Sequence, residues 1–240
     1  MNYTSATFAT THWSVILAAS QSTDAQASEA LEQLCRTYWY PLYAYVRRRG
    51  YNPEDAEDLT QEFFARFLAG NYLASVDRER AKFRSYLLGA LNHFLADAWD
   101  HAHRAKRGGG QALQPLDVRS GESRYTLEPV EELTPDRLFD RCWALTVLDQ
   151  VISRLRREYE RSGKGRLFDK LSAFLPGDAE ADSYGKLARE LGMTEGTVRV
   201  AVHRLRRRYG ELFSNEVAHT VSSPAKIHDE MRYLLGAVSS

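Results

Sequence analysis

The segment from Tyr184 to Arg208 limits the fold more than any other part of the chain, because its sequence fits two short helices joined by a glycine turn. Gly192 can adopt the left-handed conformation that ends a helix. Thr194 is a favourable N-terminal cap for the second helix, with Glu195 in its first turn. The apolar face of the first helix consists of Leu187, Ala188 and Leu191. The pattern predicts a helix-turn-helix.

A helical wheel gives the second helix one apolar and one basic face. The apolar stripe, expected to pack inward, consists of Val198, Val202, Leu205 and Tyr209. The outward positions are Gly196, Arg199, Val200, His203 and Arg207. Between residues 184 and 210 seven Lys or Arg oppose two Glu, although the whole chain carries 32 residues of each sign. A solvated helix end would explain the basic run at 206–208 alone, but the turn, cap and two faces together favour DNA binding.

The rest of the chain has helical periodicity, with no alternating strand pattern and no internal repeat, so we expect an all-α fold. No apolar run reaches the roughly 18 residues that a membrane span needs, and the polar start lacks the features of a secretory signal. Cys35 and Cys142 are isolated, which gives no sign of a disulfide framework or a thiolate zinc site. We therefore expect a soluble, cytoplasmic protein without membrane insertion.

Breaks in the periodicity divide the chain into two small helical domains. The first is expected over residues 1–107, with helices at about 13–19, 28–49, 53–68 and 81–103. Pro41 should interrupt or kink the second of these helices, and Asn52 with Pro53 should start the third. A composition rich in Gly, Pro and Ser predicts a flexible linker over 108–133. The helix-turn-helix domain then spans 134–222, and a tail of unknown role, with one short helix at 227–235, covers 223–240.

An acidic helix is the counterpart of the basic one, with five acidic side chains between Glu54 and Glu62. Its inward positions on a wheel are Ala56, Leu59, Phe63 and Phe67. The exposed positions are Asp55, Asp58 and Glu62, with Gln61 at the margin. Acids near a helix N-terminus are also favourable on a plain solvated surface, and that interpretation stays open. Acid–base catalysis is less well supported, because no nucleophile or metal ligand set lies nearby in the sequence.

Three segments together resemble bacterial RNA polymerase sigma factors. The stretch from Arg36 to Leu68, which contains Asp-Ala-Glu-Asp-Leu-Thr-Gln-Glu, is similar to sigma region 2, and Phe83 to Asp97 continues that likeness. Tyr184 to Arg208 resembles region 4. A short linker without a region 3 is typical of the extracytoplasmic-function (ECF) group. The resemblance spans roughly Cys35 to Gly210.

The resemblance implies a role for each face of the first domain. In the family the acidic helix docks on the largest polymerase subunit, which assigns core polymerase binding to Asp55, Asp58, Gln61 and Glu62.

In the family the segment after the acidic helix binds the downstream (−10) promoter element and captures unstacked bases. Each base stacked on an aromatic side chain contributes about 1 to 3 kcal/mol. The matching positions here are Phe83, Arg84, Tyr86, Asn92, His93, Asp97 and Arg104. Spacing alone favours an ordinary core role for Phe83 and Tyr86 over base capture. Tyr86 and Leu91 depart from the tryptophan and arginine that are frequent in the family.

The resemblance assigns the upstream (−35) element to the helix-turn-helix. Candidate contacts are Thr194, Gly196, Thr197, Arg199, His203, Arg204 and Arg207. An arginine can read guanine with two hydrogen bonds, whereas threonine hydroxyls and a helix N-terminus mostly hold phosphate. Val200 offers an apolar contact to a thymine methyl group.

We therefore expect a promoter-recognition subunit that has no catalytic residues, uses no cofactor and holds no metal. His93, Asp97 and His101 share a helix face, but the sequence shows no fourth ligand for a metal. The expected partners are core RNA polymerase and promoter DNA, and the resemblance adds an anti-sigma protein as a candidate. The alternative is a helix-turn-helix regulator that binds operator DNA without joining the polymerase. A recombinase or transposase would need catalytic acids or a nucleophile in basic surroundings, and the sequence suggests neither.

Overall fold

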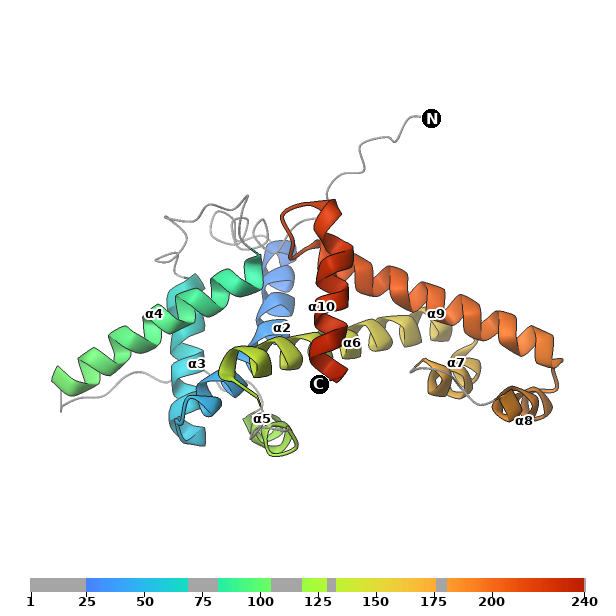
Figure 1. The fold of residues 1–240 in the computed structure, drawn as a ribbon, viewed down its shortest axis with the longest axis horizontal. Coiled ribbons are helices and arrows are strands. Elements are labelled where there is room, and N and C mark those ends of the chain that lie inside the picture. The colour runs from blue at the N-terminus through green and yellow to red at the C-terminus, as the bar shows by residue number, and fades with distance from the viewer. Residues whose placement is uncertain (1–24, 69–81, 105–117, 129–132, 176–180, 240) are drawn as a thin grey trace. The chain divides into compact units, whose positions relative to one another are not determined.

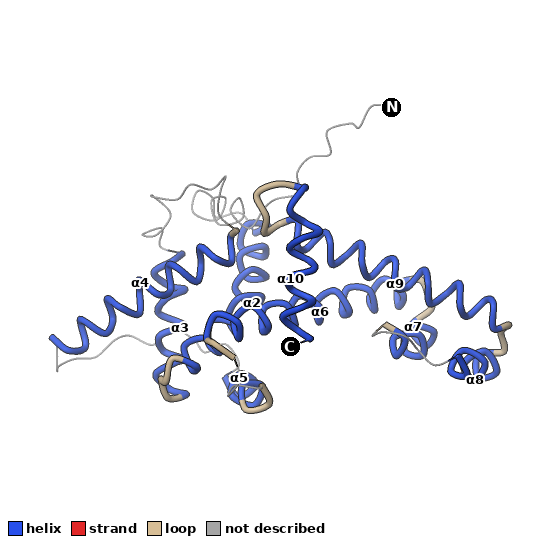
Figure 2. Tube along the Cα trace, in the orientation of Figure 1, coloured by secondary structure: helices blue, strands red, loops and turns tan. Residues whose placement is uncertain are grey.

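All regular elements in the described part of the protein are helices. The computed structural model describes residues 25–68, 82–104, 118–128, 133–175 and 181–239, and no strand occurs within these ranges (Figure 2), which confirms the all-α expectation. In chain order the α-helices are α2 (Ala25–Arg48), α3 (Pro53–Leu68), α4 (Phe83–Arg104), α5 (Val118–Tyr125), α6 (Pro135–Arg161), α7 (Gly165–Leu171), α8 (Ala181–Leu191), α9 (Glu195–Ala218) and α10 (Ile227–Ser239) (Figure 1). Short 3-10 turns follow α7 and precede α10. None of these helices combines the length and apolar composition needed to cross a membrane. The helix predicted at 13–19 lies outside the described residues.

The chain folds into two compact units whose boundaries fall inside α6 and α9. Unit 1 comprises residues 1–146 and 217–240, and unit 2 comprises residues 147–216. These units differ from the predicted domains, because residues 134–146 and the tail belong with unit 1 and not with the helix-turn-helix. The physical reason is the packing of Trp143 and of α10, which the sequence pattern does not reveal.

An aromatic core joins α2, α4 and the first half of α6 within unit 1. The ring of Tyr38 lies 5.4 Å from that of Phe83 and stacks on Trp143 at 6.0 Å. All three side chains are fully buried, and each such burial contributes about 1.5 to 3 kcal/mol. Pro41 does not interrupt α2, which continues through it. We attribute this to the buried aromatic neighbours, which offset the roughly 3 kcal/mol that a helix loses at an internal proline.

A short helix, α5, forms within the predicted linker at 108–133 and is held against α2. Both carboxylate oxygens of Glu122 accept hydrogen bonds from Arg47, at 2.8 and 2.9 Å, and Tyr43 donates a further one at 2.5 Å. A Cβ atom at Gly121 would lie only 3.0 Å from the ring of Trp39, so the close approach of the two helices requires glycine. The described part of the linker is therefore docked, contrary to a simple tether.

Unit 2 contains the second half of α6 together with α7, α8 and most of α9. Phe174 contacts Tyr184 with ring centroids 5.0 Å apart, and Tyr159 contacts Phe168 at 5.5 Å. Val151 and Leu155 of α6 are buried in the same unit. This core fixes the orientation of α9.

Candidate nucleic-acid interface and acidic docking face

The turn between α8 and α9 has the geometry that the sequence predicts. Gly192 adopts a φ of +63°, and the backbone N–H of Met193 donates to the carbonyl oxygen of Ala188 at 2.9 Å. The hydroxyl of Thr194 accepts a hydrogen bond from the N–H of Thr197 at 3.2 Å, which is the N-terminal cap of α9. The helix-turn-helix is therefore built by local chemistry.

The two faces of α9 are also as predicted. Val198 and Leu205 are completely buried and Val202 nearly so, while Tyr209 is half-buried. Burial raises the pKa of Tyr209 to about 12, with a smaller contribution from Asp149.

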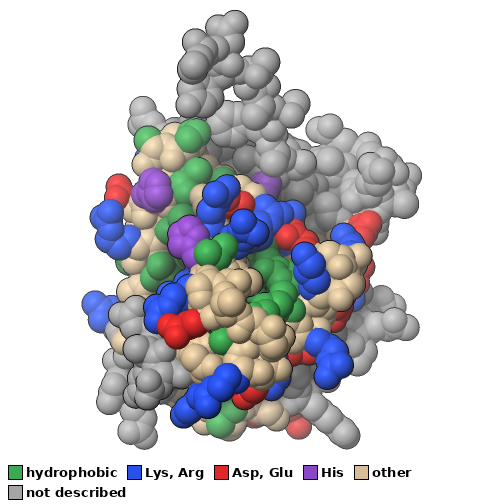
Figure 3. All heavy atoms as spheres, turned by 90° about the vertical axis from the view of Figure 1, so that its right-hand side faces the viewer, with side chains coloured by type: hydrophobic (Ala, Val, Ile, Leu, Met, Phe, Trp, Pro, Cys, Tyr) green, Lys and Arg blue, Asp and Glu red, His purple; other side chains and the backbone are tan. Residues whose placement is uncertain are grey.

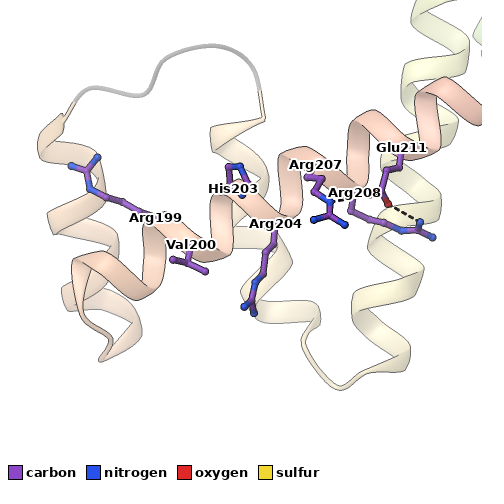
Figure 4. A pocket seen from close by; sticks show the side chains of 7 residues that line it. All are labelled: Arg199, Val200, His203, Arg204, Arg207, Arg208 and Glu211. Atoms are coloured by element: carbon purple, nitrogen blue, oxygen red, sulfur yellow. Dashed lines mark hydrogen bonds and ion pairs between the residues drawn. The ribbon is translucent and has the colours of Figure 1, made fainter. Parts of the chain in front are cut away.

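The opposite face of α9 is exposed to solvent. Its residues include Gly196, Arg199, Val200, His203, Arg204 and Arg207. A continuous hollow runs along this face, lined by Arg199, Val200, His203, Arg204, Arg207, Arg208 and Glu211 (Figure 4). Basic and histidine side chains gather around hydrophobic ones in the view of Figure 3.

Arg199 is held in place within its own unit. Its guanidinium donates to one carboxylate oxygen of Glu195 through Nε at 2.9 Å and Nη2 at 2.6 Å. The guanidinium carbon also lies 4.6 Å from the centre of the Tyr184 ring. This role of Glu195 and Tyr184 was not predicted from the sequence. The four-residue spacing of Glu195 and Arg199 was the signal that could have revealed the ion pair.

The three consecutive arginines of α9 have different environments. Arg206 donates to the carbonyl oxygen of Phe174 at 2.9 Å. Arg208 forms two hydrogen bonds with Glu158 of α6, at 2.8 and 2.9 Å, and this contact lowers the pKa of the Glu158 carboxyl. Arg207 is 74% exposed, and its Nε donates to Glu211 on the next turn at 3.0 Å. Arg206 and Arg208 therefore support the fold of unit 2, and Arg207 is the member of the run that faces solvent.

The acidic helix α3 begins at a well-formed cap. The side-chain oxygen of Asn52 accepts a hydrogen bond from the N–H of Asp55 at 2.8 Å. Ala56, Phe63 and Phe67 are completely buried, and Phe63 lies 5.8 Å from Phe94 of α4. The predicted docking residues Asp55, Asp58 and Glu62 are exposed, whereas Gln61 is half-buried and donates to Glu57 at 2.9 Å. The exposed acids share one side of α3, opposite the core.

Helix α4 exposes only some of the residues predicted to contact the downstream element. His93 and Asp97 are exposed, and Tyr86 is half-buried. The side-chain oxygen of Asn92 accepts a hydrogen bond from the Tyr45 hydroxyl at 2.7 Å. Arg104 ends the helix, and its side chain lies outside the described residues.

Phe83 and Arg84 do not face solvent, which differs from the expectation that both contact DNA. Phe83 belongs to the aromatic core, and its ring is completely buried. Arg84 is 4% exposed and forms ion pairs with Glu230 and Asp140. In this conformation neither side chain is available to a nucleic acid.

Unit 2 thus has the arrangement of a DNA-binding module, and unit 1 adds an exposed acidic helix. Residues 34–105 match the family model of sigma-70 region 2. This segment includes α3, α4 and most of α2. The match covers less than a third of the chain, and it supports a role like that of sigma-70 factors in promoter recognition with RNA polymerase. Searches of curated proteins and of solved structures gave no match.

Proposed function

We propose that the chain is a sigma subunit of the ECF group that binds core RNA polymerase and directs initiation at specific promoters. The observation that carries this proposal is the region 2 match over residues 34–105, which covers the acidic helix. To region 4 of the family we assign the helix-turn-helix that α8 and α9 form.

The acidic side of α3 is the proposed contact with the polymerase. Asp55, Asp58 and Glu62 point away from the core, and Gln61 lies at the edge of this surface. Burial, and to a smaller extent repulsion from the neighbouring Asp58, raises the pKa of Glu57. A face of this kind suits a basic protein surface and disfavours DNA, because like charges at an interface repel.

The exposed parts of α4 and α9 are the proposed promoter contacts. On α4, His93 and Asp97 lie one turn apart and Tyr86 is partly accessible, so this helix is suited to the downstream element. On α9, Arg199, His203 and Arg207 occupy the outward face that would enter the major groove at the upstream element. Thr194, Gly196, Thr197 and Arg204 complete the proposed upstream set.

Reconstitution with core polymerase tests this proposal. The full chain should co-elute with core enzyme and support initiation from a promoter selected out of a random library. The variant Asp58→Arg should weaken core binding on the order of tenfold or more, because it places a cation against a basic partner surface. The matched control is Glu29→Arg, which reverses an exposed acid on α2 outside the acidic face and should leave core binding unchanged.

A stand-alone operator-binding regulator is the alternative. It requires the full chain to bind selected duplex DNA with normal affinity but to show no association with core enzyme. That outcome, or equal core binding by Asp58→Arg and wild type, would refute the sigma-factor proposal.

A further inference from the structure

The last helix carries a buried acid, Glu230, which is only 2% exposed. One carboxylate oxygen accepts hydrogen bonds from Nε and Nη2 of Arg84, at 2.8 and 2.7 Å. The other oxygen forms an ion pair with Nζ of Lys82. Lys82 and Arg84 stand at the start of α4, so one carboxylate of α10 pairs with both cations there.

Other contacts hold α10 against the same part of unit 1. The hydroxyl of Tyr233 donates to Asp140 of α6, and the guanidinium carbon of Arg84 lies 5.2 Å from the Tyr233 ring. Arg141 donates to backbone carbonyl oxygens in the last turns of α10, which is a favourable position for a cation. Leu234 is completely buried. The helix is thus fixed near both of its ends.

The contacts of α10 involve a cation in the segment that is similar to a promoter-binding region. Arg84 lies within the segment that matches sigma-70 region 2, and it is among the residues that the sequence resemblance assigns to promoter DNA, although Glu230 now covers it. A carboxylate that accepts two hydrogen bonds from one guanidinium presents the arrangement that a phosphate would present to that arginine. In the described structure, Glu230 occupies the Nε and Nη2 donors with which Arg84 would bind a phosphate.

We propose that α10 is an intramolecular clamp that occupies the DNA-facing cations at the start of α4 and must leave before region 2 engages the promoter. This inference rests on the proposed function of α4. Removing a carboxylate from a buried arginine is costly when nothing replaces it. Exchange for a phosphate leaves no unpaired charge, and Asp140 remains as a second partner of Arg84 throughout. The clamp therefore sets a threshold for DNA binding and does not block it permanently.

The coupling between α10 docking and DNA binding is reciprocal. DNA that binds Lys82 and Arg84 must weaken the docking of α10. Any change that weakens the docking of α10 must in turn strengthen DNA binding by the free chain. Both directions can be measured in the full-length protein without polymerase.

The test compares Glu230→Arg with Asp229→Arg. Both variants change the net charge equally, but Asp229 is 79% exposed on the solvent side of α10 and serves as the matched control. The probe is a labelled random-sequence DNA, single-stranded or duplex, and the readouts are fluorescence anisotropy and hydrogen exchange of the peptides that cover α10. Glu230→Arg should exchange faster in α10 and bind DNA about tenfold more tightly than the control, which corresponds to a clamp that is closed in about nine molecules of ten. Adding DNA to wild type should also speed exchange in α10.

Equal DNA affinity of the two variants, with α10 released only in Glu230→Arg, would overturn the clamp. If Glu230→Arg fails to fold, Glu230→Gln removes the charge with little change in shape and is judged by the same criterion. The core-binding assay separates the two proposals. If the chain supports initiation but the two variants bind DNA with equal affinity, only the clamp proposal is refuted. If the chain fails to bind core enzyme but the two variants differ in DNA affinity, the sigma-factor proposal is refuted and the coupling between α10 and DNA stands.

Discussion

Replacing Glu195 with glutamine should strengthen upstream DNA binding, because this carboxylate competes with DNA for Arg199. In the structure the two side chains form a forked ion pair at 2.6 and 2.9 Å, and both are about half exposed. Arg199 must leave this pair before it can read a guanine in the major groove. The glutamine variant keeps the length of the side chain and removes its charge.

The size of the effect follows from the exposure of the pair. Exposed ion pairs contribute about 0.2 to 1 kcal/mol, so Glu195→Gln should tighten binding by about 1.4-fold to 5-fold. Arg199→Ala should have the opposite effect. A bidentate guanine contact is worth about 1 to 3 kcal/mol, from which the lost internal pair must be subtracted. With the central values of both ranges the net loss is about 1.4 kcal/mol, or roughly tenfold in Kd.

The assay is fluorescence anisotropy with a duplex selected from random DNA by the wild-type chain, at one fixed salt concentration. A double-mutant cycle decides the cause, since the gain from Glu195→Gln should disappear when Arg199 is already alanine. A gain of equal size in both backgrounds would mean that the carboxylate merely repels phosphate. Unchanged binding by Arg199→Ala would remove Arg199 from the set of base-reading residues and refute the reasoning.

Three further predictions concern the fold around the proposed interfaces. Thr194→Ala should destabilise unit 2 by about 0.5 to 2 kcal/mol in chemical unfolding, because it removes the cap of α9, and a loss below this range would show that the cap is weak. Leu205→Ala should cost about 2 to 5 kcal/mol in the same experiment, since its side chain is completely buried, and a near-neutral result would contradict the packing of α9. Hydrogen bonding from Arg47 lowers the pKa of Glu122, so the stabilisation of α5 by this pair is present above the ordinary carboxyl range and is lost as the pH falls through the lowered pKa. Protection of α5 against hydrogen exchange, taken relative to the intrinsic exchange rate at each pH, should therefore fall in acid. In Glu122→Gln this protection should be low and independent of pH over that range, and identical protection profiles would exclude the pair as the cause.

The parts of the fold that the sequence predicts well depend on local chemistry. The start of α3 at Pro53, the turn at Gly192 and the cap at Thr194 each involve residues within a few positions of one another. The same holds for the two faces of α9, because helical periodicity alone separates Val198 from Arg199.

The parts that were not predicted depend on contacts between distant residues. Helix α5 has only eight residues, and the contact of Glu122 with Arg47 joins positions 75 residues apart. The pair formed by Arg84 and Glu230 spans 146 residues, so no local pattern could show that the cation is covered. Only the folded unit brings such groups together, and in unit 1 it buries Arg84, which the sequence predicted as a DNA contact.

The neutral total charge has a structural counterpart in the pairing of the proposed DNA-facing arginines. Three such arginines have a carboxylate of the same chain as partner: Arg84 with Glu230, Arg199 with Glu195, and Arg207 with Glu211. Exchanging a carboxylate for a phosphate yields less net electrostatic free energy than pairing an unpartnered cation, so the free chain should bind DNA weakly. Under the proposed function, attachment to the polymerase offsets this weakness, because it raises the effective concentration of α4 and α9 at the promoter without any new contact. On that proposal, docking of the acidic helix is the energetic precondition for promoter binding by a chain of zero formal charge.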